Sequence, residues 1–146
     1  MQKKASAKAR AEAPSYRTFT VDSHFTAICG RTNIQNDQLT FKTASKDDLW
    51  FHVKNMPGTH VILRLMGEIP TEKAITEAAA IAAYYSSSNH FRQDEASADI
   101  ANRNGPRVEV DYCPVSHVKK IPKAKPGMVT YANYKTLLVN GFLPKI

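Results

Sequence analysis

Apolar and polar residues alternate along residues 49–54 and again along residues 60–65. Such alternation predicts β-strands, because successive side chains of a strand point to opposite faces of a sheet. Pro57 and Gly58 lie between the two segments and indicate a turn. The pattern therefore predicts a β-hairpin whose two faces differ in character.

The register of this hairpin decides which side chains share a face, because a slip of one residue moves every side chain to the other side. A two-residue turn at Pro57-Gly58 would mix aliphatic and polar residues on both faces. An odd-length loop centred on Gly58 instead pairs Phe51 with Leu65, so that Phe51 and the aliphatic residues form one face. The opposite face then carries Trp50, His52, His60 and Arg64.

A helical period of three and four residues begins after Pro70. Thr71 is a preferred N-cap residue, and Glu72 in the first turn favours the helix dipole. We therefore expect a helix at about residues 71–86, slim enough to lie close against a sheet. Its predicted apolar stripe comprises Ala74, Ile75, Ala78, Ile81, Ala82 and Tyr85.

Shorter apolar segments predict the rest of the fold. The elements indicate an α+β domain, with a mixed, mainly antiparallel sheet and one principal helix packed on it. We expect a basic flexible arm at residues 1–15, a folded domain at 16–140 with a long polar loop at about 87–107, and a C-terminal tail at 141–146. The further predicted elements are two strands within 16–29, a polar or single helical turn at 33–37, strands at 108–112 and 115–121, and a hairpin pairing 128–131 with 136–139.

The composition fits one globular domain, since 42% of the 146 residues are hydrophobic. No segment approaches the roughly 18 apolar residues of a membrane helix, and the first residues lack the apolar core of a signal peptide. We therefore expect a cytoplasmic location and no membrane partner. Cys29 and Cys113 stand singly in apolar surroundings, which predicts two reduced structural thiols.

Twenty Lys and Arg against thirteen Asp and Glu give a net charge of +7. This balance favours a polyanionic partner and an association that weakens as salt rises. Four lysines gather between residues 119 and 125, where Pro122 and Pro126 reduce the freedom lost when lysines settle on phosphates. A solvated loop is the alternative. The candidate phosphate contacts are Lys119, Lys120, Lys123, Lys125 and Arg64.

Two interpretations of the face that carries Trp50, His52 and His60 remain open. An aromatic plane and imidazole donors beside lysines suit contacts with bases and phosphates. Alternatively, Trp50 is buried beneath a neighbouring element and the histidines have backbone partners, as is usual for large aromatic residues.

Enzymatic chemistry has weaker support. In the register above, His52 and His60 lie roughly 13 Å apart, too far for one metal ion, and no compact third ligand is present. Neither a GxSxG elbow nor a Walker loop occurs. We therefore expect no catalysis, metal, cofactor or small-molecule substrate. A magnesium-dependent nuclease using Asp47, Asp48 and Asp111 stays open as an alternative.

Several motifs together resemble the NFACT-R domain family, in the same order along residues 16–140. They are Gly30-Arg31-Thr32-Asn33-Ile34-Gln35-Asn36-Asp37, residues 48–53, residues 57–62, the alanine-rich stretch at 78–86, Val110-Asp111-Tyr112, and Lys119-Lys120 through Lys125-Pro126-Gly127. Positions expected to support the binding residues are Arg31, Asn33, Asn36, Asp48, Gly58 and Gly127.

The resemblance implies an RNA-binding part of larger proteins that act in ribosome-associated quality control. Those proteins engage the large ribosomal subunit with a peptidyl-tRNA and promote carboxy-terminal tailing of stalled chains. The implied partners are the ribosome and RNA, either tRNA or large-subunit rRNA or both, with the Trp50 motif and the 119–125 lysines as matching positions.

Other expectations follow from the same resemblance. Some bacterial members were named as fibronectin-binding proteins, so an adhesive, protein-binding module is an alternative. The amino-terminal domain and helical arms of the full-length proteins are not in this sequence, and tailing activity is therefore not expected of it. A single-domain protein and an excised domain both stay open, and the sequence indicates no oligomeric state.

Overall fold

The computed structural model describes residues 15–86 and 107–144 of the chain. Its strands are β1 (Arg17–Val21), β2 (Phe25–Cys29), β3 (Leu49–Val53), β4 (Val61–Arg64), β5 (Arg107–Pro114), β6 (Val118–Lys120), β7 (Val129–Tyr131) and β8 (Lys135–Asn140). Its helices are α2 (Asn33–Gln38), which continues as a π-helical turn at Leu39–Thr43, α3 (Glu72–Tyr84), and a 3-10 turn at Val115–His117.

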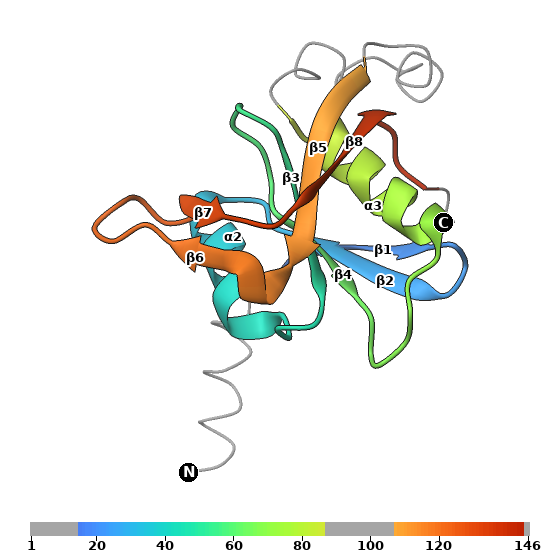
Figure 1. Ribbon diagram of the computed structural model, residues 1–146, viewed down its shortest axis with the longest axis horizontal. Coiled ribbons are helices and arrows are strands. Elements are labelled where there is room, and N and C mark those ends of the chain that lie inside the picture. The colour runs from blue at the N-terminus through green and yellow to red at the C-terminus, as the bar shows by residue number, and fades with distance from the viewer. Residues whose placement is uncertain (1–14, 87–106, 145–146) are drawn as a thin grey trace.

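The strands form two sheets, both antiparallel throughout. The larger sheet has six strands in the order β1-β2-β4-β3-β5-β8, and the smaller one pairs β6 with β7. The principal helix α3 lies against the larger sheet, whereas α2 and the smaller sheet lie on the other side of the molecule (Figure 1). The predicted α+β class with one principal helix is therefore confirmed.

Both faces of the larger sheet are buried at its central strands, β3 and β4. On one face, Phe51 and Leu63 pack against the alanines of α3. On the other, Trp50 packs with Leu39 of the π-helical turn and Val118 of the smaller sheet. The face that sequence alternation assigned to a partner is thus largely covered by the chain itself.

The helix α3 forms as its sequence predicts. Thr71 is the N-cap, and its hydroxyl accepts a hydrogen bond from the Ala74 amide at 3.0 Å. The small side chains allow close packing, as Gly141 shows, because a Cβ there would lie 2.6 Å from the backbone nitrogen of Tyr84. Gly141, assigned to a C-terminal tail, therefore lies against this helix.

The hairpin of β3 and β4 has the predicted faces but a different register. Phe51 pairs with Val61 instead of Leu65, so the connection is centred on Met56 and not on Gly58. A shift of four residues is even and leaves every side chain on its predicted face. The predicted pairs were therefore wrong, although the division into faces was right.

The physical reason for the shift lies in the connection between the two strands, where Thr59 and His60 bind Gly30 and α2 instead of extending the hairpin. Thr59 donates its hydroxyl hydrogen to the Gly30 carbonyl at 2.6 Å, and the amide of His60 donates to Asn36 Oδ1 at 3.2 Å. Asn55 has a left-handed backbone, with φ of 58°, where the chain turns away from β3. A pattern of alternation contains no information on these long-range partners.

The carboxy-terminal pairing was also predicted wrongly. Residues 129–131 pair with β6, while residues 135–140 pair with β5 in the larger sheet. The predicted strand at 115–121 is a 3-10 turn followed by the short β6. The predicted turn at 33–37 is longer than expected, because α2 and the π-helical turn extend to Thr43.

Some expectations fall on residues outside the described ranges. These include the basic arm, apart from Ser15, and the polar loop at 87–107, apart from Arg107, which begins β5. Cys29 and Cys113 are both free and buried, in agreement with structural thiols, and burial raises the pKa of each to about 11. Within 15–86 and 107–144, no helix has the length and apolar character needed to cross a membrane.

Candidate nucleic-acid interface

A cavity of about 530 Å³ opens between the β3–β4 connection and the segment that links β6 to β7. His52, Asn55 and residues 56–58 contribute from the first segment, and residues 125–129 from the second. Asn33 and Asn36 of α2 lie between them. We call this cavity the central cleft.

The four predicted lysines lie on one hairpin, formed by β6, β7 and the turn between them. All four are exposed, and Lys125 lines the central cleft. Lys120 Nζ lies 2.9 Å from Asp37 Oδ2 in an exposed ion pair. Lys123 occupies a left-handed position of the turn, with φ of 63°. The structure thus brings Lys119, Lys120, Lys123 and Lys125 onto one protruding element beside the cleft.

Trp50 and His60 are sealed inside the protein, with relative exposures of 0% and 1%. The indole Nε1–H donates to His60 Nδ1 at 3.1 Å, and the Thr40 hydroxyl lies 2.7 Å from the same nitrogen. His60 Nε2–H donates to the Gly127 carbonyl at 2.9 Å. Neither ring is available for stacking, so the expected direct contact is corrected to burial beneath the smaller sheet.

The buried network fixes both the charge and the role of His60. Because two donors point at Nδ1, the ring is neutral and carries its proton on Nε2. Burial, and then the neighbouring His52, lower the pKa of His60 to about 3, against the opposing effects of the Gly127 carbonyl and Asp37. The imidazole therefore fastens the lysine-bearing segment to the larger sheet.

His52, by contrast, reaches the central cleft. Its ring is stacked on Trp50, with centroids 5.7 Å apart and an interplanar angle of 4°. Its Nδ1–H donates to the Val53 carbonyl at 2.6 Å. Burial lowers its pKa, opposed by the backbone of Val53 and Gly58. Of the three aromatic residues predicted to meet RNA, His52 is the one that lines the central cleft.

The predicted separation of roughly 13 Å between His52 and His60 is wrong. The ring centroids of His52 and His60 lie 5.5 Å apart, because the observed register brings residue 60 back beside the hairpin. The described residues nevertheless contain no group of three or more His, Cys, Asp or Glu side chains that could hold a metal ion.

Arg64 and Asp48 contact each other at the far end of the hairpin. Arg64 Nε lies 2.8 Å from Asp48 Oδ2, and the buried carboxylate also accepts hydrogen bonds from the amides of Ser45 and Leu65. Neither residue lines the central cleft. The structure therefore separates Arg64 from the lysines with which it was grouped.

The 30–37 motif positions both sides of the central cleft. Asn36 Oδ1 accepts from His60 N, and a Cβ at Gly30 would lie 2.3 Å from the same oxygen. Gly127 has a left-handed φ of 86°, and a Cβ added to it would lie 3.2 Å from the Asn33 carbonyl oxygen. Gly58 is similarly confined, since its Cβ would meet Val53 at 2.8 Å.

Arg31 belongs to this motif but does not line the central cleft. Its Nε–H donates to the Ser15 carbonyl at 2.7 Å, and its amide donates to Gln35 Oε1. Together with Arg17 it lines a second hollow, which shares Asn33, Asn36, Pro57 and Gly58 with the central cleft. Arg31 is therefore a neighbour of the cleft and not part of it.

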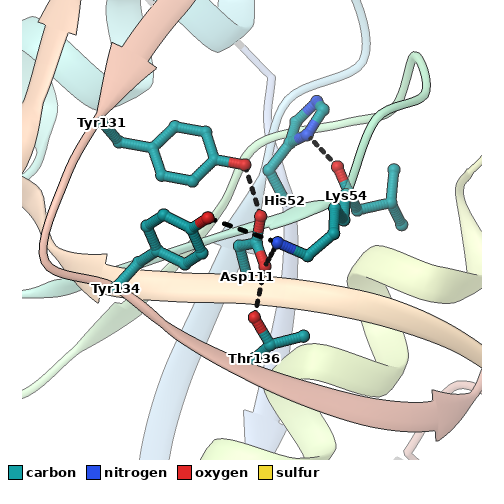
Figure 2. A network of polar contacts seen from close by, with 7 residues as sticks. His52, Lys54, Asp111, Tyr131, Tyr134 and Thr136 are labelled. Carbon is teal, nitrogen blue, oxygen red and sulfur yellow. Dashed lines mark hydrogen bonds and ion pairs between the residues drawn. The ribbon is translucent and has the colours of Figure 1, made fainter.

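Sequence reasoning missed the part played by Asp111, which joins the two sheets (Figure 2). Its carboxylate is 1% exposed. It accepts hydrogen bonds from Tyr131 at 2.5 Å and Thr136 at 2.7 Å, and Lys54 Nζ lies 3.0 Å away. Lys54 also lies over the ring of Tyr134, 4.6 Å from its centroid. The signal in the sequence was an aspartate within an apolar strand, for which a buried partner is the usual explanation.

Comparison with known proteins gives consistent results. The family model of the NFACT protein RNA binding domain matches residues 15–103. The Rqc2 homolog RqcH of Bacillus subtilis (strain 168) is 39% identical over 138 residues, which cover 94% of this chain and 21% of that protein. The Rqc2 homolog RqcH of Streptococcus suis (strain 05ZYH33) is 36% identical over 130 residues, covering 89% and 21%.

A solved structure is also similar to the chain. It is the C-terminal part of the fibronectin/fibrinogen-binding protein from Streptococcus suis, with a TM-score of 0.74 and 34% sequence identity. The match covers 90% of this chain and 47% of that one. The chain thus spans about a fifth of the length of the curated relatives named above.

Proposed function

The chain belongs to the family of NFACT protein RNA-binding domains, and on that premise we propose that it binds RNA at the lysine hairpin and the central cleft without cleaving it. The observation that carries the proposal is the gathering of four exposed lysines on the β6–β7 hairpin. Lysines so placed can neutralise several phosphates of one strand. The net charge of +7 supports the same partner.

The two buried carboxylates argue against the nuclease alternative. Asp48 and Asp111 each accept hydrogen bonds from protein groups and each has a cationic partner, Arg64 and Lys54 respectively. A catalytic metal would have to displace these partners. In the proposed function both residues stabilise the fold.

We further propose a role in ribosome-associated quality control, in the cytoplasm, with tRNA or large-subunit rRNA as the ligand. The similarity to proteins called Rqc2 homolog RqcH supports this assignment. Lysine contacts with phosphates recognise backbone and shape more than base edges. The choice between the two RNAs is a matter for measurement.

The test compares K123A/K125A with the wild-type chain in binding to tRNA, an rRNA fragment and an unrelated RNA. At about 0.1 M salt, affinity for all three should fall by a similar factor, roughly tenfold to fiftyfold, because two phosphate contacts and their counterion release are lost. Dissociation constants from fluorescence anisotropy provide the measurement. Both substitutions are at exposed positions, so the variant should keep the fold.

The matched control is K73A. Lys73 is an exposed lysine of α3. This helix packs on the face of the larger sheet opposite to the face covered by the smaller sheet. Its loss should leave every affinity unchanged. Because K73A removes one charge and K123A/K125A removes two, a loss of log affinity in K73A half as large as in the double variant would mean that charge alone, and no defined site, governs binding. Salt-insensitive binding to a protein, with none to RNA, would favour the adhesive alternative.

A further inference from the structure

The central cleft is more enclosed and more apolar than lysine contacts with phosphates require. Its volume of about 530 Å³ lies within the range of about 300–1,000 Å³ that is typical of small-molecule sites. Met56, Pro57, Met128 and Val129 contribute apolar surface. A phosphate is fully polar and gains nothing from such a lining. The occupant that fits is a flat, largely apolar group attached to a phosphate chain.

Aromatic side chains of the central cleft are held in place by Trp50: His52 is stacked on the indole at an interplanar angle of 4°, and Tyr131 is tilted against it at 56°. His52 and Tyr131 both line it, and both contact the buried Trp50, with ring centroids 5.7 Å and 4.7 Å from the indole. The hydroxyl of Tyr131 is fixed by its hydrogen bond to Asp111. A surface held in place before binding loses little entropy when a planar ligand joins it.

Polar groups are present at few positions around this lining. Asn33 and Asn55 are exposed and contribute to the cleft, and a side-chain amide offers both donors and an acceptor. Lys125 supplies the positive charge at the same cavity. Apolar surface, amides and one cation together match the base, edge and phosphate of a nucleotide.

We infer that the central cleft receives one unstacked nucleobase of an unpaired RNA segment, while Lys125 contacts the adjoining phosphate. This inference rests on the proposed function and adds to it the class of RNA that the site selects. A base inside a duplex is stacked on its neighbours and cannot enter. The protein should therefore prefer loops, bulges and single-stranded ends over paired RNA of equal charge.

The experiment compares a short oligouridylate with an abasic oligoribose phosphate of equal length, which has the same charges and no bases. The wild-type chain should bind the oligouridylate about tenfold more tightly, as expected for one stacked base. The variant M128A/N55G should lose this preference and keep its affinity for the abasic strand. Glycine suits position 55, because the backbone there is left-handed.

The control variant is M66A/N133G, which changes the same residue types away from the cleft. Met66 is exposed on the β4–α3 connection, and Asn133 has a left-handed φ of 53°, close to that of Asn55. This variant should retain the preference for bases. Circular dichroism and an unfolding curve establish that both variants are folded.

Failure of the base site and failure of the proposed function would give different results. Equal, salt-dependent binding of the two strands by the wild-type chain would overturn the base site and leave the proposed function standing. A preference for oligouridylate that survives in M128A/N55G would place the base elsewhere and also overturn the inference. Binding of neither strand would overturn the proposed function together with it.

Discussion

Replacing His60 by alanine is expected to lower the free energy of unfolding by about 4 kcal/mol. The change removes the acceptor of the Trp50 indole and the donor to the Gly127 carbonyl, in a region with almost no access to water. Each buried polar group left without a partner costs about 1–3 kcal/mol, and the vacated volume adds to this. Chemical denaturation followed by tryptophan fluorescence measures the loss.

Loss of His60 should also have a local signature. Its bond to Gly127 is a direct link between the larger sheet and the lysine-bearing segment. Amide hydrogen exchange at residues 125–129 should therefore accelerate more than exchange in α3. The matched control is H24A, since His24 is exposed and its pair with Glu68 is exposed too. A similar small effect of both changes would show that the buried network does not stabilise the fold.

Replacing Asp111 by alanine is expected to cost about 3 kcal/mol of stability. Tyr131 and Thr136 both lose the charged acceptor that joins their strands to β5, and hydrogen bonds to charged groups contribute about 1.5–3 kcal/mol each. Lys54 adds little, because its ammonium can turn to solvent. The unfolding free energy from urea titration is the measurement.

D111A has a matched control and a second expected effect, on RNA binding. Asp47 is an exposed aspartate, so D47A should change stability by no more than about 0.5 kcal/mol. Because Tyr131 lines the central cleft, D111A should weaken binding of an oligouridylate more than binding of its abasic counterpart. Stability equal to the wild type in D111A would mean that the network between the sheets is not formed in solution.

The local pattern was sufficient to predict the elements and the faces of the central hairpin. Alternation placed Phe51 and Trp50 on opposite sides, and the structure confirms this. Helix α3 was predictable for a similar reason, since its cap at Thr71 and its apolar spacing are local features. Both features depend on residues that are close to one another in sequence.

Long-range contacts account for what the pattern could not predict. The burial of Trp50 depends on Val118 and Tyr131, which are distant along the chain. Alternation distinguishes the two faces of a strand but does not reveal whether the second face is covered. The predicted register of the hairpin was wrong because Asn36, in the separate helix α2, accepts a hydrogen bond from the backbone amide of His60.

The candidate site was predictable only in part for the same reason. Clustering in sequence was enough to group the lysines on one segment, but the hairpin of β6 and β7 that carries them was not predicted. Arg64 was grouped with them because it shares a face with Trp50, yet its actual partner is the buried Asp48. Met128 and Asn55 were not singled out, since apolar and amide side chains acquire meaning only when a cavity joins them.

The salt dependence of RNA binding by the wild-type chain shows whether the hairpin lysines bind phosphates. With the four hairpin lysines each on one phosphate, log affinity for tRNA should fall against log salt with a slope between about −2.8 and −3.6, depending on whether single or double strands are contacted. A measured slope in this range is the predicted result. A slope near zero, or no detectable binding at low salt, would contradict the account.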